Sequence, residues 1–158
     1  MTGAQGHCPC TLLKGFALKN PVFCRALHGK GNVEKGDRML TAGLDALKEL
    51  RSPFALCEMD IHQMVAQRLT EAELPFVHEA KLAPGCRIDY LVDRIGIEIK
   101  KGKPDASAVK KQLMRYAACD GVDAIILLTQ RTVVVPKTVF GKPVHVIVLN
   151  QLWGVALP

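Results

Sequence analysis

The sequence lacks the features that would place the protein in or across a membrane. No apolar run approaches the length needed to cross a bilayer, and the first residues do not show the basic and then apolar order of a signal peptide. Low-complexity tracts are also missing, while 49% of the residues are hydrophobic and 23% are charged. These proportions favour a folded core over a disordered chain. We therefore expect a soluble, cytoplasmic protein.

A disulfide framework is also not expected. Six cysteines are spread through 158 residues, and a chain of this length can bury a core without covalent support. We therefore expect reduced thiols. Zinc binding is the alternative for one N-terminal group of residues, namely His7, Cys8, Cys10, Cys24 and His28. Because only one residue separates Cys8 from Cys10, a tetrahedral site would be strained there, and incidental thiols are the better interpretation.

Acidic residues are scarce in the segment from 100 to 115. It contains a single acid, Asp105, and six basic residues: Lys100, Lys101, Lys103, Lys110, Lys111 and Arg115. The whole chain has a formal net charge of +6 and a pI of about 9.1. Such a balance favours a polyanionic partner, and the alternative interpretation of the segment is a solvated basic helix face.

The chain length suits one domain, whose elements can be predicted from hydrophobic periodicity. Residues 1–35 show no clear period and are interpreted as an N-terminal extension, which leaves residues 36–158 as the domain. Leucines at helical spacing predict a helix over 38–50, and an apolar stripe predicts a second helix over 57–74. The period then shifts to two, which predicts three strands in a meander over 75–83, 86–93 and 96–102.

A helix and two further strands are expected after the meander. Ser107 is the predicted cap of the helix, whose apolar face carries Val109, Leu113, Tyr116 and Ala117. The apolar run over 123–130 does not alternate, which is typical of a strand buried on both faces, and 142–150 predicts one more strand. The predicted fold class is α/β, with a mixed central sheet of about four to five strands flanked by helices.

Three polar residues of the meander form the candidate chemical site. Alternate residues of a strand share a face, so Glu98 and Lys100 point the same way. Asp89 is expected on the face opposite its neighbours Ile88 and Tyr90, and across from Glu98 if the two strands pair. Two such carboxylates repel unless a cation lies between them. Magnesium suits this pair, because it binds one or two carboxylates together with water and phosphate oxygens.

The stretch GCRIDYLVDRIGIEIKKG resembles the PD-(D/E)XK nuclease superfamily, which includes restriction endonucleases, Holliday-junction resolvases and recombination-type exonucleases. Asp89 stands at the position of the family aspartate, and Glu98-Ile99-Lys100 at that of its E-x-K, while Ile88 replaces the family's proline. Glu58 is similar to the family's first acidic residue. Gln112 and Tyr116 resemble the Q-x-x-x-Y element of the exonuclease branch, and one helical turn separates them.

The resemblance implies a restriction-endonuclease-like core and Mg²⁺- or Mn²⁺-dependent hydrolysis of DNA phosphodiester bonds. The catalytic residues it implies are Asp89, Glu98, Lys100, Glu58 and Gln112, and the metal would be held by Asp89, Glu98 and Glu58. Lys100 would act on the attacking water, and Gln112 would position Lys100 or a phosphate. Nucleic-acid contacts are expected from Lys101, Lys103, Lys110, Lys111, Arg115 and Tyr116. A homodimer or larger nucleoprotein assembly is expected because cutting two strands needs two sites.

Alternatives stay open for single residues and for the whole protein. Glu58 also suits the macrodipole of its helix, and Tyr116 also suits a core position with its hydroxyl in water. A catalytically inactive nucleic-acid-binding module or subunit with the same fold is the alternative function. RNA is an alternative substrate, because nothing in the sequence distinguishes a deoxyribose from a ribose.

Overall fold

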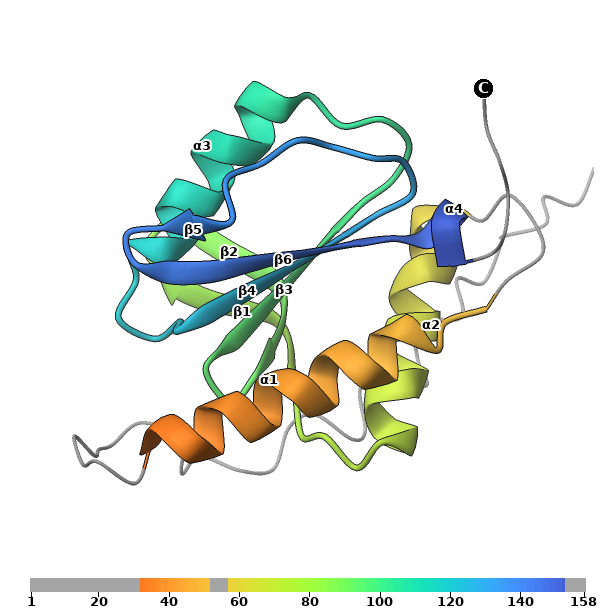
Figure 1. The fold of residues 1–158 in the computed structure, drawn as a ribbon, viewed down its shortest axis with the longest axis horizontal. Coiled ribbons are helices and arrows are strands. Elements are labelled where there is room, and N and C mark those ends of the chain that lie inside the picture. The colour runs from red at the N-terminus through yellow and green to blue at the C-terminus, as the bar shows by residue number, and fades with distance from the viewer. Residues whose placement is uncertain (1–31, 52–56, 153–158) are drawn as a thin grey trace, which may run out of the picture.

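The structure is a computed structural model that describes residues 32–51 and 57–152 (Figure 1). Its elements are α1 (Asn32–Lys48), α2 (Glu58–Glu71), β1 (Val77–Ala83), β2 (Cys86–Val92), β3 (Ile95–Lys100), α3 (Ala106–Ala117), β4 (Ala124–Thr129), β5 (Thr138–Val139), β6 (Lys142–Val148) and α4 (Leu149–Leu152). The N-terminal cysteines and histidines considered for zinc lie outside the described residues. Within the described part, no helix is long and apolar enough to cross a membrane.

Six strands form a mixed sheet in the order β1-β2-β3-β4-β6-β5. The first three strands are an antiparallel meander, β4 and β6 continue parallel to β3, and β5 returns antiparallel to β6. This confirms the predicted α/β class and mixed sheet, whereas the predicted count of four to five strands is too low. The strand missed is β5, whose two residues are too few to leave a period in the sequence.

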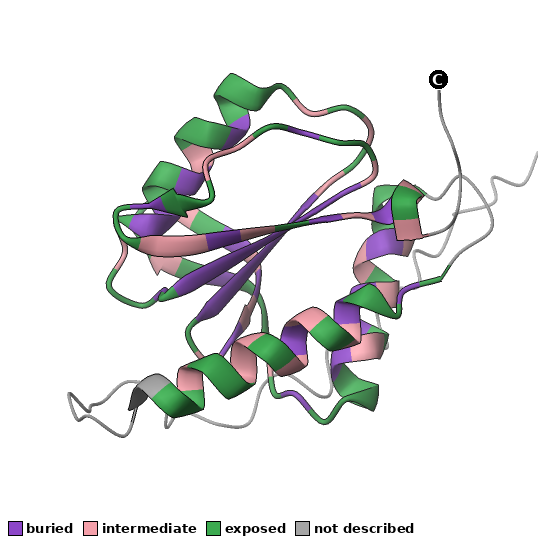
Figure 2. Cartoon of the chain, in the orientation of Figure 1, coloured by how far each residue is buried: buried purple, intermediate pink, exposed green. Residues whose placement is uncertain are grey.

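Helices cover both faces of the sheet, with α1 and α2 on one face and α3 on the other (Figure 1). All six residues of β4 are buried, which confirms the strand predicted to be covered on both sides (Figure 2). Ile126 and Leu128 pack in the cluster below α1 and α2, while Ile125 and Leu127 pack in the cluster below α3. β4 is therefore the centre of both hydrophobic layers.

Two helix starts differ from the sequence-based expectation. α1 begins at Asn32, inside the segment for which no element was predicted. The cap of α3 is Asp105 and not Ser107, because the Asp105 carboxylate accepts hydrogen bonds from the backbone N–H groups of Ser107 and Ala108. An aspartate one residue before the helix satisfies these otherwise unpaired donors, whereas Ser107 already lies inside the first turn.

The backbone of the meander is irregular at Asp89. Ile88 packs in the cluster below α3, while Tyr90 packs in the cluster below α1 and α2, so the prediction that both face away from Asp89 is wrong. β1 pairs His78 with Tyr90 and Ala80 with Ile88, and between these two pairs Glu79 has a φ of 52°. This left-handed conformation breaks the regular alternation of faces along the pair of strands.

Candidate active site

Glu98 of β3 is the centre of a hydrogen-bonded group that joins the sheet to α3. Its side chain is only 3% exposed. Oε1 accepts hydrogen bonds from Lys100 Nζ at 2.5 Å and from Gln112 Nε2 at 2.6 Å, and Oε2 accepts one from the Tyr116 hydroxyl at 2.8 Å. Glu98 and Lys100 therefore share a face, as the strand period predicts, and α3 adds the other two side chains.

Asp89 of β2 reaches the same part of β3 by a different route. The ladder between β2 and β3 pairs Tyr90 with Ile97 and ends there, one position before Asp89 and Glu98. Asp89 Oδ2 instead accepts a hydrogen bond from the backbone N–H of Ile99 at 2.7 Å. The carboxylate thus replaces a strand partner at the point where the two strands stop pairing.

The two carboxylates interact unfavourably. Burial raises the pKa of Glu98, and the charge of Asp89 raises it further, while Lys100 and the Tyr116 hydroxyl act in the opposite direction. The net result is a raised pKa, because loss of hydration and a like charge outweigh one ammonium and one hydroxyl. An additional cation near Asp89 and Glu98 would relieve both costs.

The donor set of this pair fits a hard divalent cation. Carboxylate oxygens are ligands of Mg²⁺, which keeps several waters and needs only one or two protein carboxylates. Among residues 32–51 and 57–152, no group of three or more histidine, cysteine, aspartate or glutamate side chains is arranged to hold a metal. The arrangement fits an ion held by Asp89 and Glu98 with water and substrate, and it does not fit a closed protein cage.

Glu58 is not part of this hydrogen-bonded group. It is the first residue of α2, which confirms its predicted place in a first turn, and it is exposed. No hydrogen bond of the described residues links it to Asp89 or Glu98. Asp60, in the same turn, is the acid that interacts with a charge at the end of β3, that of Lys101. Hydrogen bonds from Cys57 lower the pKa of Asp60, and the charge of Lys101 lowers it further.

Tyr116 lies inside the protein. It is 2% exposed, and its hydroxyl contacts Glu98 Oε2, the carbonyl oxygen of Arg87 at 2.9 Å and Gln112 Nε2. Burial raises the pKa of this hydroxyl well above its ordinary value, so it remains a proton donor. A buried ring has no surface to offer to a nucleic acid, and the contacts favour positioning of Glu98 over the predicted substrate contact.

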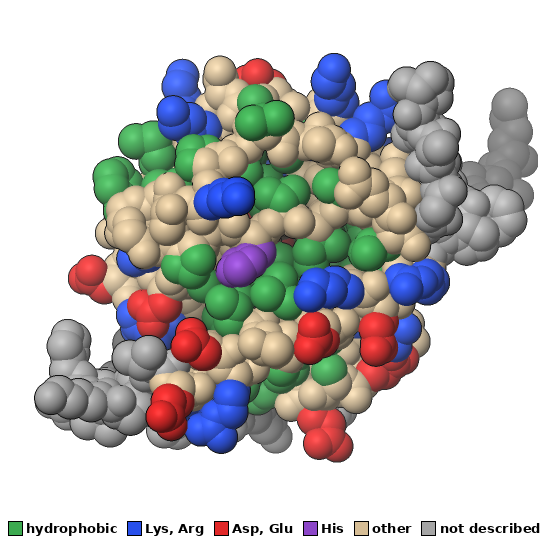
Figure 3. Space-filling model, in the orientation of Figure 1, with side chains coloured by type: hydrophobic (Ala, Val, Ile, Leu, Met, Phe, Trp, Pro, Cys, Tyr) green, Lys and Arg blue, Asp and Glu red, His purple; other side chains and the backbone are tan. Residues whose placement is uncertain are grey.

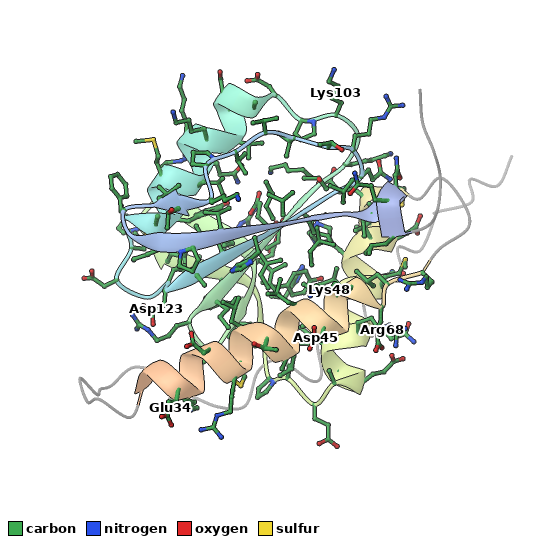
Figure 4. The ribbon with its side chains drawn as sticks, viewed as in Figure 1. Glu34, Asp45, Lys48, Arg68, Lys103 and Asp123 are labelled. Carbon is green, nitrogen blue, oxygen red and sulfur yellow. The ribbon has the colours of Figure 1, made fainter. Side chains whose placement is uncertain are left out.

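The other predicted nucleic-acid contacts are on the surface. These exposed residues are Lys101, Lys103, Lys110, Lys111 and Arg115. Lys103 points away from the body of the protein on the connection between β3 and α3 (Figure 4). Lys and Arg side chains also project along the upper edge of the molecule, where Figure 1 places α3 and this connection (Figure 3).

Two polar residues at the end of β4, beside Lys100, were not predicted as site residues because they belong to no motif. Thr129 ends β4, pairs in register with Lys100 and is fully buried, and its hydroxyl has no hydrogen-bond partner among the described residues. The side-chain Oε1 of Gln130 accepts a hydrogen bond from the backbone N–H of Gly102 at 2.8 Å. The backbone N–H of Gln130 donates to the carbonyl of Lys100 at 3.2 Å. The sequence signal that could have identified them is the pair of polar residues, Thr129 and Gln130, at the end of the apolar run over 123–130.

Comparison of the chain with protein-family models, with curated proteins and with solved structures gives no match. The function must therefore be argued from the arrangement of these residues.

Proposed function

We propose that this protein is a metal-dependent nuclease with a restriction-endonuclease-like core of the PD-(D/E)XK type, and that DNA is its substrate. The observation that carries the proposal is a buried glutamate, Glu98, beside a second carboxylate and a lysine at the end of a central strand. A buried carboxylate with a like charge and an ammonium beside it is typical of catalytic groups, because a structural core gains little from such an arrangement.

Each residue of the group has a task in hydrolysis. Asp89 and Glu98 would hold Mg²⁺ or Mn²⁺, which when bound lowers the pKa of its water and offsets charge on the phosphate. Lys100 is 29% exposed, so its ammonium can reach solvent and orient the attacking water by donating a hydrogen bond to it. Gln112 and Tyr116 hold the Glu98 carboxylate by hydrogen bonds, which fixes its direction before substrate arrives.

The surface charges support a phosphate backbone as the ligand. Lys101 and Lys103 follow directly on the site strand, and Lys110, Lys111 and Arg115 are exposed on α3. Exposed lysines neutralise phosphates without reading bases, so they would hold the strand while the site acts on it. Asp105 occupies the N-terminus of α3 with its carboxylate, which leaves the phosphate contacts to these side chains.

The decisive experiment compares cleavage of plasmid and linear DNA, and of RNA, with Mg²⁺ and with a chelator. We expect DNA cleavage in Mg²⁺, and a loss of about 10²- to 10⁴-fold in Asp89→Asn, Glu98→Gln and Lys100→Ala with DNA binding retained. Asp93→Asn is the matched control, because Asp93 lies in the turn between the same strands at a φ of 53° that asparagine tolerates. Full activity in Lys100→Ala would contradict the mechanism, and cleavage of RNA alone would contradict the substrate.

One observation favours a second candidate, a nucleic-acid-binding module without turnover. Three donors already engage Glu98, which would also suit a structural ion pair that links α3 to the sheet. Salt-sensitive DNA binding with no cleavage in Mg²⁺ or Mn²⁺ would select this function.

Sedimentation with and without duplex DNA tests the proposed homodimer, since cutting both strands at one place needs two sites.

A further inference from the structure

Two thiols meet between the start of β2 and the turn that follows α3. Cys86 is the first residue of β2, and Cys119 lies two residues beyond the end of α3. Their sulfur atoms are 3.9 Å apart, and both side chains are half-buried. Cys119 Sγ also donates a hydrogen bond to the carbonyl of Arg115 at 3.3 Å. The two sulfurs are therefore in van der Waals contact although the residues are 33 positions apart in the sequence.

The local backbone allows the sulfurs to approach further. A disulfide requires the two sulfurs to come closer by about 2 Å, which side-chain rotation and a small backbone shift can supply. Cys86 directly follows the turn of Pro84 and Gly85, and Cys119 lies in the turn that leads to β4. Cys86 forms the last pair of the ladder between β1 and β2, with Ala83, and Cys119 lies beyond the end of α3, so a shift at either one disturbs only the end of an element.

We propose that Cys86 and Cys119 are a redox-active thiol pair that closes to an intramolecular disulfide by exchange with a small disulfide such as oxidised glutathione. One cysteine thiolate attacks a sulfur of oxidised glutathione, forms a mixed disulfide and releases one glutathione thiolate. The second cysteine thiolate then attacks the cysteine sulfur of the mixed disulfide and releases the other glutathione. The two cysteines are oxidised, oxidised glutathione is reduced to two thiols, and the two cysteine protons pass to them.

The surroundings of the Cys86 thiol disfavour its ionised form. Burial raises the pKa of the Cys86 thiol, and its neighbour Cys119 raises it further. Because the thiolate is the nucleophile, a thiol with a raised pKa attacks slowly.

The disulfide would act on the part of the chain that carries the candidate active site. Closing the pair makes a covalent loop of residues 86–119, which contains Asp89, Glu98, Lys100, Gln112 and Tyr116. The disulfide would be a second link between these parts of the chain, because the hydrogen bond from the Tyr116 hydroxyl to the Arg87 carbonyl already joins α3 to β2. Oxidation would thus hold α3 against the meander, whether or not the protein cleaves DNA.

The test uses the full-length protein incubated with oxidised glutathione. We expect the loss of two thiols, an intact mass lower by two hydrogen atoms, and a linked pair of peptides that carry Cys86 and Cys119. The midpoint of thermal unfolding should rise by roughly 5–15 °C and return when the disulfide is reduced. Because these readouts do not involve nucleic acid, they can fail while the nuclease proposal stands, and the reverse also holds.

The control variants separate this pair from the other thiols. A variant with Cys8, Cys10, Cys24 and Cys57 replaced by serine keeps only the proposed pair and should behave like the wild type. In Cys86→Ser, Cys119 should stop at the mixed disulfide and carry one glutathione. Unchanged thiols at positions 86 and 119 in wild-type protein, stable glutathione adducts on both, or disulfides between two chains would each overturn the proposal.

Discussion

Removing the Tyr116 hydroxyl tests whether it supports an ionised Glu98. Tyr116→Phe keeps the buried ring and removes the donor that lies 2.8 Å from Glu98 Oε2. A hydrogen bond to a charged group contributes about 1.5–3 kcal/mol, because the carboxylate otherwise stays buried without that donor. We expect the free energy of unfolding to fall by about 2 kcal/mol at a pH where Glu98 is ionised. Cleavage, if the proposed function holds, should fall with it.

The chain provides a matched control in its other tyrosine. Tyr90 is 1% exposed, and its hydroxyl donates to the backbone carbonyl of His62 at 2.8 Å. The acceptor is neutral at every pH, so Tyr90→Phe should cost about 1 kcal/mol, and this cost does not depend on the ionisation of Glu98. Both variants remove one oxygen from a buried ring, and they differ in the charge of the acceptor.

The pH dependence distinguishes the two hydroxyls. Burial and Asp89 raise the pKa of folded Glu98 above its unfolded value. The stability contributed by protonated Glu98 is therefore fully present below the ordinary glutamate pKa and is lost as the pH rises through the folded pKa. The Tyr116 hydroxyl favours the charged form of Glu98, and Tyr116→Phe removes it. The pKa of Glu98 in the folded variant is therefore higher than in wild type, and the variant loses more stability as the pH rises. The difference from wild type should be smallest at about pH 4, near the cost of losing a hydrogen bond to a neutral acceptor, and grow as the pH rises.

Urea unfolding followed by circular dichroism, in chelator and at a series of pH values, measures these differences. Equal losses for both variants at every pH would refute the reasoning, because they would show that the Tyr116 hydroxyl has no charged partner. A loss in Tyr116→Phe that shrinks as the pH rises would refute it as well. A double-mutant cycle with Glu98→Gln then isolates the interaction between the two side chains.

Two further predictions address α3. Asp105→Ala should lower the free energy of unfolding by about 1 kcal/mol and Ser107→Ala by much less, as measured by urea unfolding, and the reverse order would restore Ser107 as the cap. In DNA binding measured at several salt concentrations, Lys110→Ala with Lys111→Ala should reduce the slope of log affinity against log salt by roughly 1.8, whereas Lys48→Ala on α1 should leave it unchanged. An unchanged slope in the double variant would remove α3 from the nucleic-acid surface.

Local periodicity was sufficient to predict most of the secondary structure. The strand period placed Glu98 and Lys100 on one face, and the structure confirms this with a direct contact between their side chains. The unbroken apolar run over 123–130 predicted a strand covered on both sides, and every residue of β4 is buried. Such features depend on neighbours in the sequence, so the sequence by itself determines them.

Short elements and backbone irregularities required the tertiary structure. β5 has two residues and exists because Lys142 and Pro143 of β6 pair with it. Ile88 and Tyr90 pack in opposite hydrophobic layers, against the alternation that their spacing predicts, and the partner strand β1 has a left-handed residue, Glu79, between the residues that pair with them. In both cases the conformation depends on a partner strand, and local propensity carries no information about that partner.

The candidate site shows the same division between local pattern and long-range packing. The sequence determined which residue types are present, their order, and the common face of Glu98 and Lys100. Only the packing of α3 on the sheet decided that Tyr116 is buried against Glu98, and that Cys119 meets Cys86. These contacts join residues 18 and 33 positions apart, and their geometry depends on how the helix sits on the strands. Tyr116, expected either as a nucleic-acid contact or as a core residue with its hydroxyl in water, is buried with its hydroxyl on Glu98 Oε2.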